Sequence, residues 1–245
     1  LLNGSYLLQR RYSVLDFPSA LWMAFKITLE NQIVDSELSE KVKKQLENMK
    51  GGTPLDESIT FGGLEESGNH VLTPSRRQQA EAVIGCVHCN MPVLLEGPAA
   101  VGKTALIDFL SKHMLGDKGS ERLLFRVNNS ASTTVQDYLG SYLPSGDGDF
   151  VFRDGVLLKA MRYGCWFLAD EFNLAEPAVM SVLYPLLEGQ ASISVPGTDI
   201  VVKAHKDFRF FATQNDAKNY AGRFVLPVSL RNRMLEVQVR DFPAD

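Results

Sequence analysis

The sequence predicts an α/β fold with a parallel five-stranded sheet and helices on both of its faces. Short apolar runs of the kind found in buried strands occupy residues 92–96, 122–128, 165–169, 208–213 and 235–239. Segments between several of these runs place apolar residues at helical spacing. A glycine-rich turn at residues 97–104 joins the first run directly to such a helix. In a sheet of this kind, ligands bind at the carboxyl ends of the strands.

Length and composition restrict the class of protein. The 245 residues are 45% hydrophobic, which is enough to bury a full α/β core. The net charge of −4 provides no basic field, so we expect no direct sequence-specific binding to nucleic acid. Three cysteines cannot form a disulfide framework, and no apolar run reaches membrane-spanning length. We therefore expect an intracellular protein of a reducing compartment, without membrane partners.

The first 70 residues are expected to precede the sheet domain. Residues 1–50 contain two stretches with helical spacing of apolar residues and are expected to form a small helical segment. Residues 51–70 carry glycines and acids without a period, which predicts a linker. Residues 71–245 form the predicted sheet domain. Because the chain opens at Leu1 rather than at methionine, we expect it to be a piece of a longer protein.

A helix is expected to precede the first strand, with Thr73 as its cap and Pro74 at its first position. The end of this helix carries Cys86-Val87-His88-Cys89, which has the residue types of a metal or redox motif. Only one other cysteine, Cys165, exists, so a four-ligand zinc set cannot be assembled from these residues. We favour ordinary packing of a helix end.

Residues 97–104 match the phosphate-binding pattern G-x-x-x-x-G-K-[ST] and lie between a predicted strand and a predicted helix. The glycines let the backbone wrap so that successive N–H groups face an anion. Lys103 is then expected to reach the β and γ phosphates of ATP, and Thr104 to bind Mg²⁺. The residues expected to contact the nucleotide are Gly97, Pro98, Ala99, Ala100, Val101, Gly102, Lys103, Thr104 and Ala105.

The apolar run 165–169 delivers two carboxylates, Asp170 and Glu171, at its carboxyl end. Beside a phosphate loop, Asp170 is expected to hold Mg²⁺, directly or through water, and Glu171 to orient and polarise the attacking water. Acids that begin a helix are the alternative interpretation. The complete phosphate loop about 70 residues earlier favours the functional one.

The remaining motifs lie on either side of the Asp-Glu pair. Residues 150–155 and Pro196-Gly197 predict two small hairpins, residues 156–163 predict a helix, and Pro185 is expected to kink or end another. Asn215, after the run 208–213, could contact the γ-phosphate or could be a turn residue. Arg223, Arg231 and Arg233 could be surface ion pairs or phosphate-sensing groups.

From residue 71 to the end, the order of these parts resembles AAA+ ATPases of the dynein-related group. Several stretches resemble in particular the repeated modules of the midasin family, giant AAA+ proteins of large-ribosomal-subunit assembly. The stretches that carry this resemblance are VLTPS at 71–75, VLLEGP at 93–98, DYLGSY at 137–142, DGVL at 154–157, DEFNLA at 170–175, FATQN at 211–215 and LRNR at 230–233.

The resemblance implies roles for the remaining polar residues. Asn215 matches the sensor-1 asparagine, and Arg233, with Arg231 as the alternative, matches an arginine finger that acts in trans on a neighbouring module. It also implies that the strand before Asn215 lies between the other two site-bearing strands, and that both hairpins are inserts of this group. The sequence departs from the family pattern at Phe172, at residues 183–186 and at Asp216. The family lid would follow Asp245, and residues 1–50 are expected to belong to the lid of a preceding module.

The predicted activity is Mg²⁺-dependent ATP hydrolysis within a ring of AAA+ modules. The partners implied are the neighbouring modules and a protein or ribonucleoprotein client that the ring remodels or releases. The expected location is the nucleus or nucleolus if the function is that of the midasin family, and otherwise the cytoplasm. The alternatives are a nucleotide-binding structural module with little turnover, a dynein-type motor, and a chaperone or chelatase module.

Overall fold

The computed structural model describes residues 40–41, 44–45, 73–88, 90–116, 123–146, 148–215 and 226–239. Of the expected amino-terminal segment, residues 40–41 and 44–45 are helical, and the rest lies outside the described residues. The expected linker at 51–70, Cys89, Asp216 and Arg223 also lie outside them. The division of the chain at residues 50 and 70 therefore stays a prediction.

The predicted five-stranded parallel sheet is confirmed. Its members are β1 (Val93–Glu96), β2 (Leu124–Asn128), β5 (Trp166–Asp170), β8 (Arg209–Gln214) and β9 (Leu235–Gln238). They lie in the order β2-β5-β8-β1-β9, and every neighbouring pair is parallel. Strand β8 therefore lies between β1 and β5, as the resemblance implied. This order brings the carboxyl ends of all three together at one edge of the sheet.

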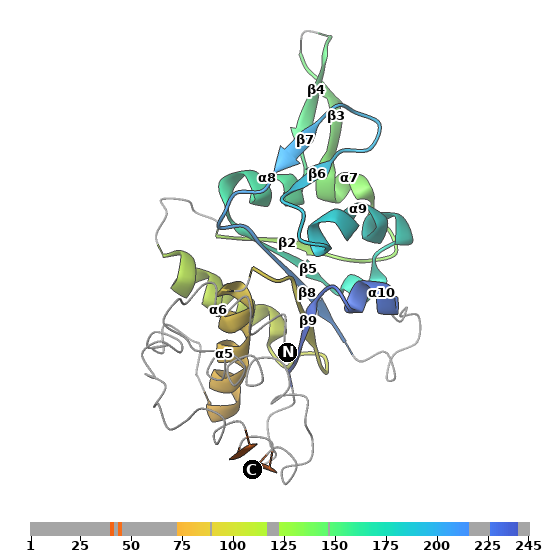
Figure 1. Ribbon diagram of the computed structural model, residues 1–245. Helices are drawn as coiled ribbons and strands as arrows, with labels where there is room; N and C mark the ends of the chain where they lie inside the picture. Colours follow the sequence, from red (N-terminus) through yellow and green to blue (C-terminus); the bar gives the residue numbers. More distant parts are fainter. Residues whose placement is uncertain are drawn as a thin grey trace.

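Helices cover both faces of the sheet, as predicted (Figure 1). Helices α5 (Pro74–His88) and α6 (Lys103–Leu115) cover one face. Helices α7 (Val135–Leu139), α8 (Val156–Tyr163) and α9 (Pro177–Leu187) cover the other. Alternate strand residues divide between the two cores, so that Trp166 and Leu168 face α6 while Phe167 and Ala169 face α8 and α9. Within the described ranges, no helix combines the length and apolar character needed to cross a membrane.

Both predicted hairpins are present and project from the side of the sheet that α7, α8 and α9 cover (Figure 1). The second hairpin pairs β6 (Ser192–Ser194) with β7 (Val201–Lys203), around Pro196-Gly197 as expected. The first pairs β3 (Gly140–Pro144) with β4 (Phe150–Asp154), so the predicted range 150–155 contains only the second strand of this hairpin. Sequence analysis did not identify β3, because this strand shows no alternation of buried and exposed residues.

Two details differ from or sharpen the expectations. Helix α9 continues through Pro185 and ends at Leu187, so the proline, which lacks the N–H that would bond the carbonyl of Ser181, lies in the last turn of the helix. Three short elements were not predicted, namely helix α7, the 3₁₀ turn η1 (Phe172–Leu174) after the Asp-Glu pair, and helix α10 (Val228–Arg231) before β9. All three are too short to give a periodic signal in the sequence.

Candidate nucleotide-binding site

The phosphate loop lies between β1 and α6, with a backbone suited to an anion. Ala100 and Gly102 have left-handed conformations, with φ of 62° and 80°, and α6 begins directly after them at Lys103. Such turns before a helix orient backbone N–H groups toward one point and add the positive end of the helix dipole. The loop therefore fits a phosphate group.

Gly97 is required for another reason, because the end of β9 lies against it. The amide of Val239 donates a hydrogen bond to the carbonyl of Glu96, at 2.7 Å. A Cβ atom at position 97 would lie 2.0 Å from the carbonyl oxygen of Val239. Only glycine permits this approach of the last described strand to the loop.

Lys103 is buried within the loop. Its Nζ donates to the carbonyl oxygens of Gly97, at 2.9 Å, and Pro98, at 2.6 Å, and to Oδ1 of Asn215, at 2.6 Å. The ammonium group is thus placed between the loop and the end of β8, at a position only 7% exposed. A buried ammonium group that is bonded to carbonyl oxygens at the phosphate loop can exchange these partners for the oxygens of a phosphate group.

Asp170 has the donor chemistry that Mg²⁺ requires. Its Oδ2 accepts a hydrogen bond from Thr104 Oγ1 at 3.0 Å, and its Oδ1 accepts one from the Thr213 hydroxyl. A carboxylate and a hydroxyl oxygen at this spacing are hard oxygen ligands of the type that Mg²⁺ takes, with water and phosphate completing its shell. The same Oδ2 also pairs with the guanidinium of Arg126, whose Nη2 lies 2.5 Å away. The residues therefore fit a cation at this carboxylate.

Glu171 is oriented by its backbone and by Asn215. Its φ of 53° is left-handed, which is uncommon for a residue other than glycine and is found mostly where function demands it. The amide of Glu171 donates to Thr213 Oγ1 at 3.1 Å, and its Oε1 accepts a hydrogen bond from Asn215 Nδ2. One amide side chain, Asn215, therefore touches both Lys103 and Glu171.

A second layer of buried polar residues holds this geometry. Asn129 donates through both its backbone amide and its Nδ2 to the carbonyl of Asp170, at 2.9 and 2.8 Å, and accepts from the Tyr138 hydroxyl at 2.9 Å. Burial raises the pKa of Tyr138, so its hydroxyl stays a proton donor. On the other side, Arg76 of α5 donates to the carbonyl of Val101 at 2.5 Å, and desolvation by burial lowers its pKa.

The two candidate finger arginines are held at other carboxylates. Arg231 bridges Glu236, at 2.6 Å, and Glu96, at 3.2 Å, and the hydrogen bond that Arg231 donates to Glu236 raises the pKa of Arg231. Arg233 pairs with Glu188 at the end of α9, at 2.7 Å, and lies 5.1 Å from the ring centre of Tyr184. Arg231 thus braces the sheet edge beside the loop, whereas Arg233 is held against the end of α9, and the two side chains are similarly exposed, at 29% and 32%.

The structure brings together five predicted side chains, those of Lys103, Thr104, Asp170, Glu171 and Asn215. Sequence reasoning missed Thr213, Asn129, Arg76 and Arg126, which match no motif. Thr213 could have been found from the strand order, because the register of β5 and β8 pairs Ala169 with Ala212 and so places Thr213 beside Asp170.

Of the Cys86-Val87-His88-Cys89 motif, Cys89 and the His88 side chain lie outside what the structure describes, so the choice between packing and a metal site stays a prediction. Cys86 and Cys165 are both buried, and Cys86 packs in the core between α5, α6 and the sheet. No group of three or more His, Cys, Asp or Glu side chains is close enough to hold an ion within the ranges that the structure covers. Packing of a helix end is the observed role of Cys86.

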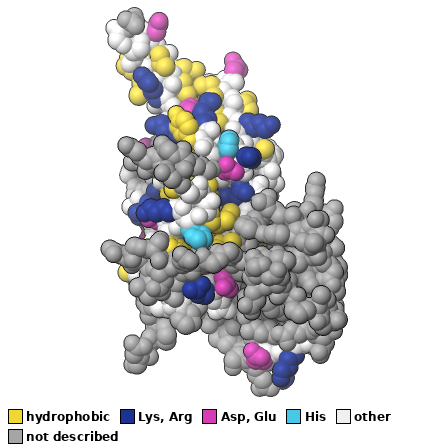
Figure 2. Space-filling view, turned by 90° about the vertical axis from the view of Figure 1, so that its left-hand side faces the viewer, with side chains coloured by type: hydrophobic (Ala, Val, Ile, Leu, Met, Phe, Trp, Pro, Cys, Tyr) yellow, Lys and Arg dark blue, Asp and Glu magenta, His cyan; other side chains and the backbone are white. Residues whose placement is uncertain are grey.

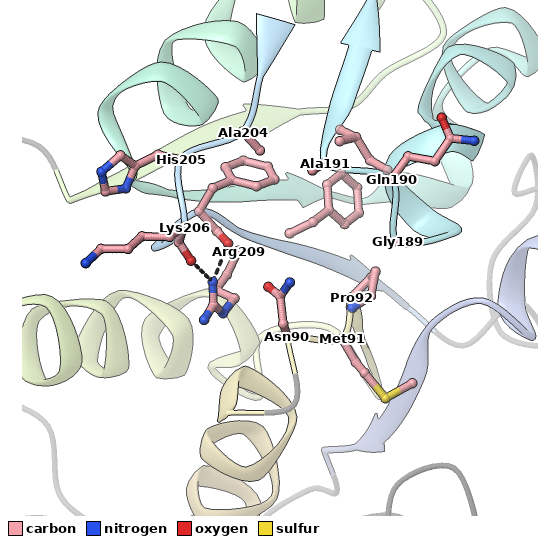
Figure 3. A pocket seen from close by; sticks show the side chains of 13 residues that line it. Asn90, Met91, Pro92, Gly189, Gln190, Ala191, Ala204, His205, Lys206 and Arg209 are labelled. Carbon is pink, nitrogen blue, oxygen red and sulfur yellow. Dashed lines mark hydrogen bonds between the residues drawn. The ribbon is translucent and has the colours of Figure 1, made fainter. Parts of the chain in front are cut away.

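A separate cavity of about 140 Å³ lies at the opposite, amino-terminal end of β1 and β8 (Figure 3). Two of its lining residues, Arg209 and Lys206, are cations, and Arg209 donates to the backbone carbonyls of Val87, Lys206 and Phe208 at 2.7–2.9 Å. The described residues of the lining include no carboxylate or hydroxyl side chain that could hold Mg²⁺ beside a phosphate. The polar constellation at the carboxyl ends remains the better candidate.

Comparison with known proteins agrees with this geometry. Residues 92–234, more than half of the chain, match the family model described as AAA domain (dynein-related subfamily). The chain is 37% identical over 178 residues to Midasin of Dictyostelium discoideum, and 34% identical over 209 residues to Midasin of Giardia intestinalis. These alignments cover 72% and 79% of this chain but only 3% and 4% of the two relatives.

More distant similarities extend to bacteria. An uncharacterized protein of Staphylococcus saprophyticus is 31% identical over 154 residues, which are 61% of this chain and 56% of that protein. A crystal structure of a candidate ATPase from Cytophaga hutchinsonii superimposes with a TM-score of 0.50 at 21% identity, over 70% of this chain and 47% of that one, and shows the same fold. The family match and the two Midasin relatives establish that the chain belongs to the dynein-related subfamily of AAA domains.

Proposed function

We propose that this chain binds ATP with Mg²⁺ and hydrolyses it as one module of an AAA+ ring. The observation that carries the proposal is the convergence of Lys103, Asp170, Glu171 and Asn215 at the carboxyl ends of three adjacent strands. Membership of the subfamily supports nucleotide use, and the arrangement of these side chains supports turnover.

Each side chain has a distinct task in this proposal. Lys103 exchanges its carbonyl partners for phosphate oxygens and neutralises their charge. Thr104 and Asp170 would hold Mg²⁺, which supplies electrostatic stabilisation of the triphosphate when bound. Glu171 accepts a hydrogen bond from the attacking water and orients it, and Asn215 keeps the Glu171 carboxylate in position while it contacts Lys103.

The neighbouring module would receive the arginine finger. Arg233 is the better candidate, because its partner Glu188 is 43% exposed, and an ion pair with an exposed carboxylate is weak enough to be exchanged. Arg231 is held by two carboxylates of its own sheet edge. The site in this chain would receive the equivalent arginine from another module, so the isolated chain is expected to turn ATP over slowly.

The hairpin β3–β4 supports contacts with other proteins. Tyr142, Leu143, Phe150 and Val151 are each at least 43% exposed on this projecting hairpin, and Figure 2 shows hydrophobic side chains along it. Similarity to Midasin supports the remodelling or release of a ribonucleoprotein client, namely the maturing large ribosomal subunit, and hence a nuclear location.

The test is turnover by the assembled ring with Glu171→Gln in this module. We expect the ATP hydrolysis that this module contributes to fall by about 10²- to 10⁴-fold while ATP affinity is retained, since the amide cannot accept a proton or orient water as the carboxylate does. Glu176→Gln, at an exposed glutamate without a side-chain cap bond, is the matched control. Unchanged hydrolysis in the Glu171 variant would reject this role and favour a structural nucleotide-binding module.

A further inference from the structure

One ion pair at the site belongs to no motif. Arg126 Nη2 lies 2.5 Å from Asp170 Oδ2, the same oxygen that accepts the hydrogen bond from Thr104 at 3.0 Å. The oxygen that would bind Mg²⁺ is therefore in direct contact with a positively charged side chain of the same protein.

The fold explains how Arg126 reaches this position. Strand β2 is an edge strand, and its register pairs Arg126 with Leu168 and Asn128 with Asp170. Val127 packs in the core on the α8 and α9 side, so Arg126 faces the other side of the sheet, where Asp170 and the start of α6 lie. The Arg126 side chain is 48% exposed, whereas that of Asp170 is 9% exposed. The arginine can leave for solvent without repacking of the core, and Asp170 cannot.

The buried carboxylate needs a positive partner, and two partners compete for it. An unpaired charge at a position as buried as Asp170 is costly, so Arg126 stabilises the site before a metal arrives. A cation bound by Asp170 Oδ2 and Thr104 Oγ1 would take the same lone pairs and would repel a guanidinium at this distance.

We infer that Arg126 is a competitor of Mg²⁺ for Asp170: it neutralises this carboxylate in the metal-free site and is displaced into solvent when the Mg²⁺–nucleotide complex binds. The inference rests on the proposed function, because it assumes that nucleotide occupies the loop. In this role Arg126 is a positioning residue that keeps Asp170 next to Thr104. Its competition with the metal also reduces the difference between the affinities of the site for Mg²⁺-bound and for metal-free nucleotide.

The test compares the affinity of the chain for a fluorescent, non-hydrolysable ATP analogue in excess Mg²⁺ and in EDTA. The measured quantity is the ratio of the two dissociation constants, metal-free over Mg²⁺-bound. We expect Arg126→Ala to raise this ratio by about threefold to tenfold, the range for a charge-assisted pair at a partly exposed site. Arg126→Lys keeps the charge and is expected to stay within about twofold of the parent chain.

Arg162→Ala is the matched control. Arg162 has the same exposed fraction, 48%, and pairs with Asp154 at 2.6 Å, a carboxylate that is not among the predicted site residues. Its ratio is expected to equal that of the parent chain. If Arg126→Ala fails to fold, as judged by its thermal unfolding transition, Arg126→Gln gives the same comparison with a polar side chain of similar length.

The outcomes separate the inference from the proposed function. A parent chain that binds the analogue in neither condition overturns the proposed function and the inference with it. A parent chain that binds, with a ratio that Arg126→Ala leaves unchanged or lowers, overturns only the inference. A folded Arg126→Ala chain that loses affinity equally in Mg²⁺ and in EDTA would show that Arg126 contacts phosphate, which also overturns the inference.

Discussion

The polar site at the carboxyl ends of β5 and β8 and the segment 228–239, which carries Arg231 and Arg233, are both rich in charged groups but use them differently. In the polar site, Lys103 and Asp170 are buried and contact residues more than 40 positions away in the sequence. In the segment, Arg233 pairs with Glu188, whose side chain is 43% exposed. The polar site is therefore assembled within this chain, whereas the finger role that we propose for the segment would act on a second module.

The largest effect is expected for Arg233→Ala in the assembled ring, which tests whether this arginine acts on a neighbouring site. If Arg233 serves a neighbouring site, the turnover at that site falls by roughly 10³-fold, the size reported for an arginine that stabilises transition-state charge in trans. To isolate the contribution of the neighbouring site, ATP turnover is measured in a ring in which the Asp-Glu pair is inactivated in every module except that neighbour. An unchanged rate at that neighbour, with a reduced rate in Arg231→Ala, would transfer the role to Arg231.

Lys103→Ala tests the other region. We expect the affinity for ATP to fall by about 10²-fold or more, because the backbone loop alone cannot replace a charge-assisted contact to the phosphates. Lys112→Ala is the matched control, since it removes an exposed lysine of the same helix that pairs with Asp108 at 2.7 Å. Titration calorimetry with ATP and Mg²⁺ measures both. Equal affinities in the two variants would contradict the assignment of the loop.

Arg231→Ala is expected to affect stability. Arg231 braces Glu96 and Glu236, and its loss leaves two partly buried carboxylates next to each other. The hydrogen bonds from Gln214 and Gln238 to Glu96 remain, so we expect the free energy of unfolding to fall by about 2 kcal/mol rather than more. Urea denaturation of the chain gives this value. A loss below about 0.5 kcal/mol would place Arg231 among surface ion pairs of little weight.

Tyr138→Phe gives the smallest expected effect. The change removes the hydroxyl that donates to Asn129 at 2.9 Å and leaves a buried acceptor unpaired, which costs about 1 kcal/mol of unfolding free energy. Because Asn129 still donates to the Asp170 carbonyl, ATP affinity is expected to change less than twofold. If the binding free energy for ATP falls by more than the free energy of unfolding does, the Tyr138–Asn129 hydrogen bond contributes to the position of Asp170 as well as to stability.

Apolar runs predicted the strands of the sheet. The motifs predicted the polar side chains at its carboxyl edge, because Gly97 to Thr104 and Asp170-Glu171 are each continuous in the sequence and each has a known chemical role. The strand order came from the resemblance, since the pairing of β8 with both β1 and β5 has no local signal. Local patterns could not assign Arg126 and Thr213, because their contacts with Asp170 depend on the register of strands that are 40 or more residues apart. For Thr213, the strand order implied by the resemblance would have been sufficient. Helix α10 is held by tertiary contacts of Leu230 rather than by its own periodicity.

The approach of Val239 to Gly97 has a consequence for communication between modules. The carbonyl of Val239 occupies the space that any side chain at position 97 would need, and its amide is bonded to Glu96. The end of β9 and the first residue of the loop are therefore held in direct contact, so a displacement of one requires a displacement of the other. In the proposed ring, a neighbour that contacts this segment would act next to the phosphate loop.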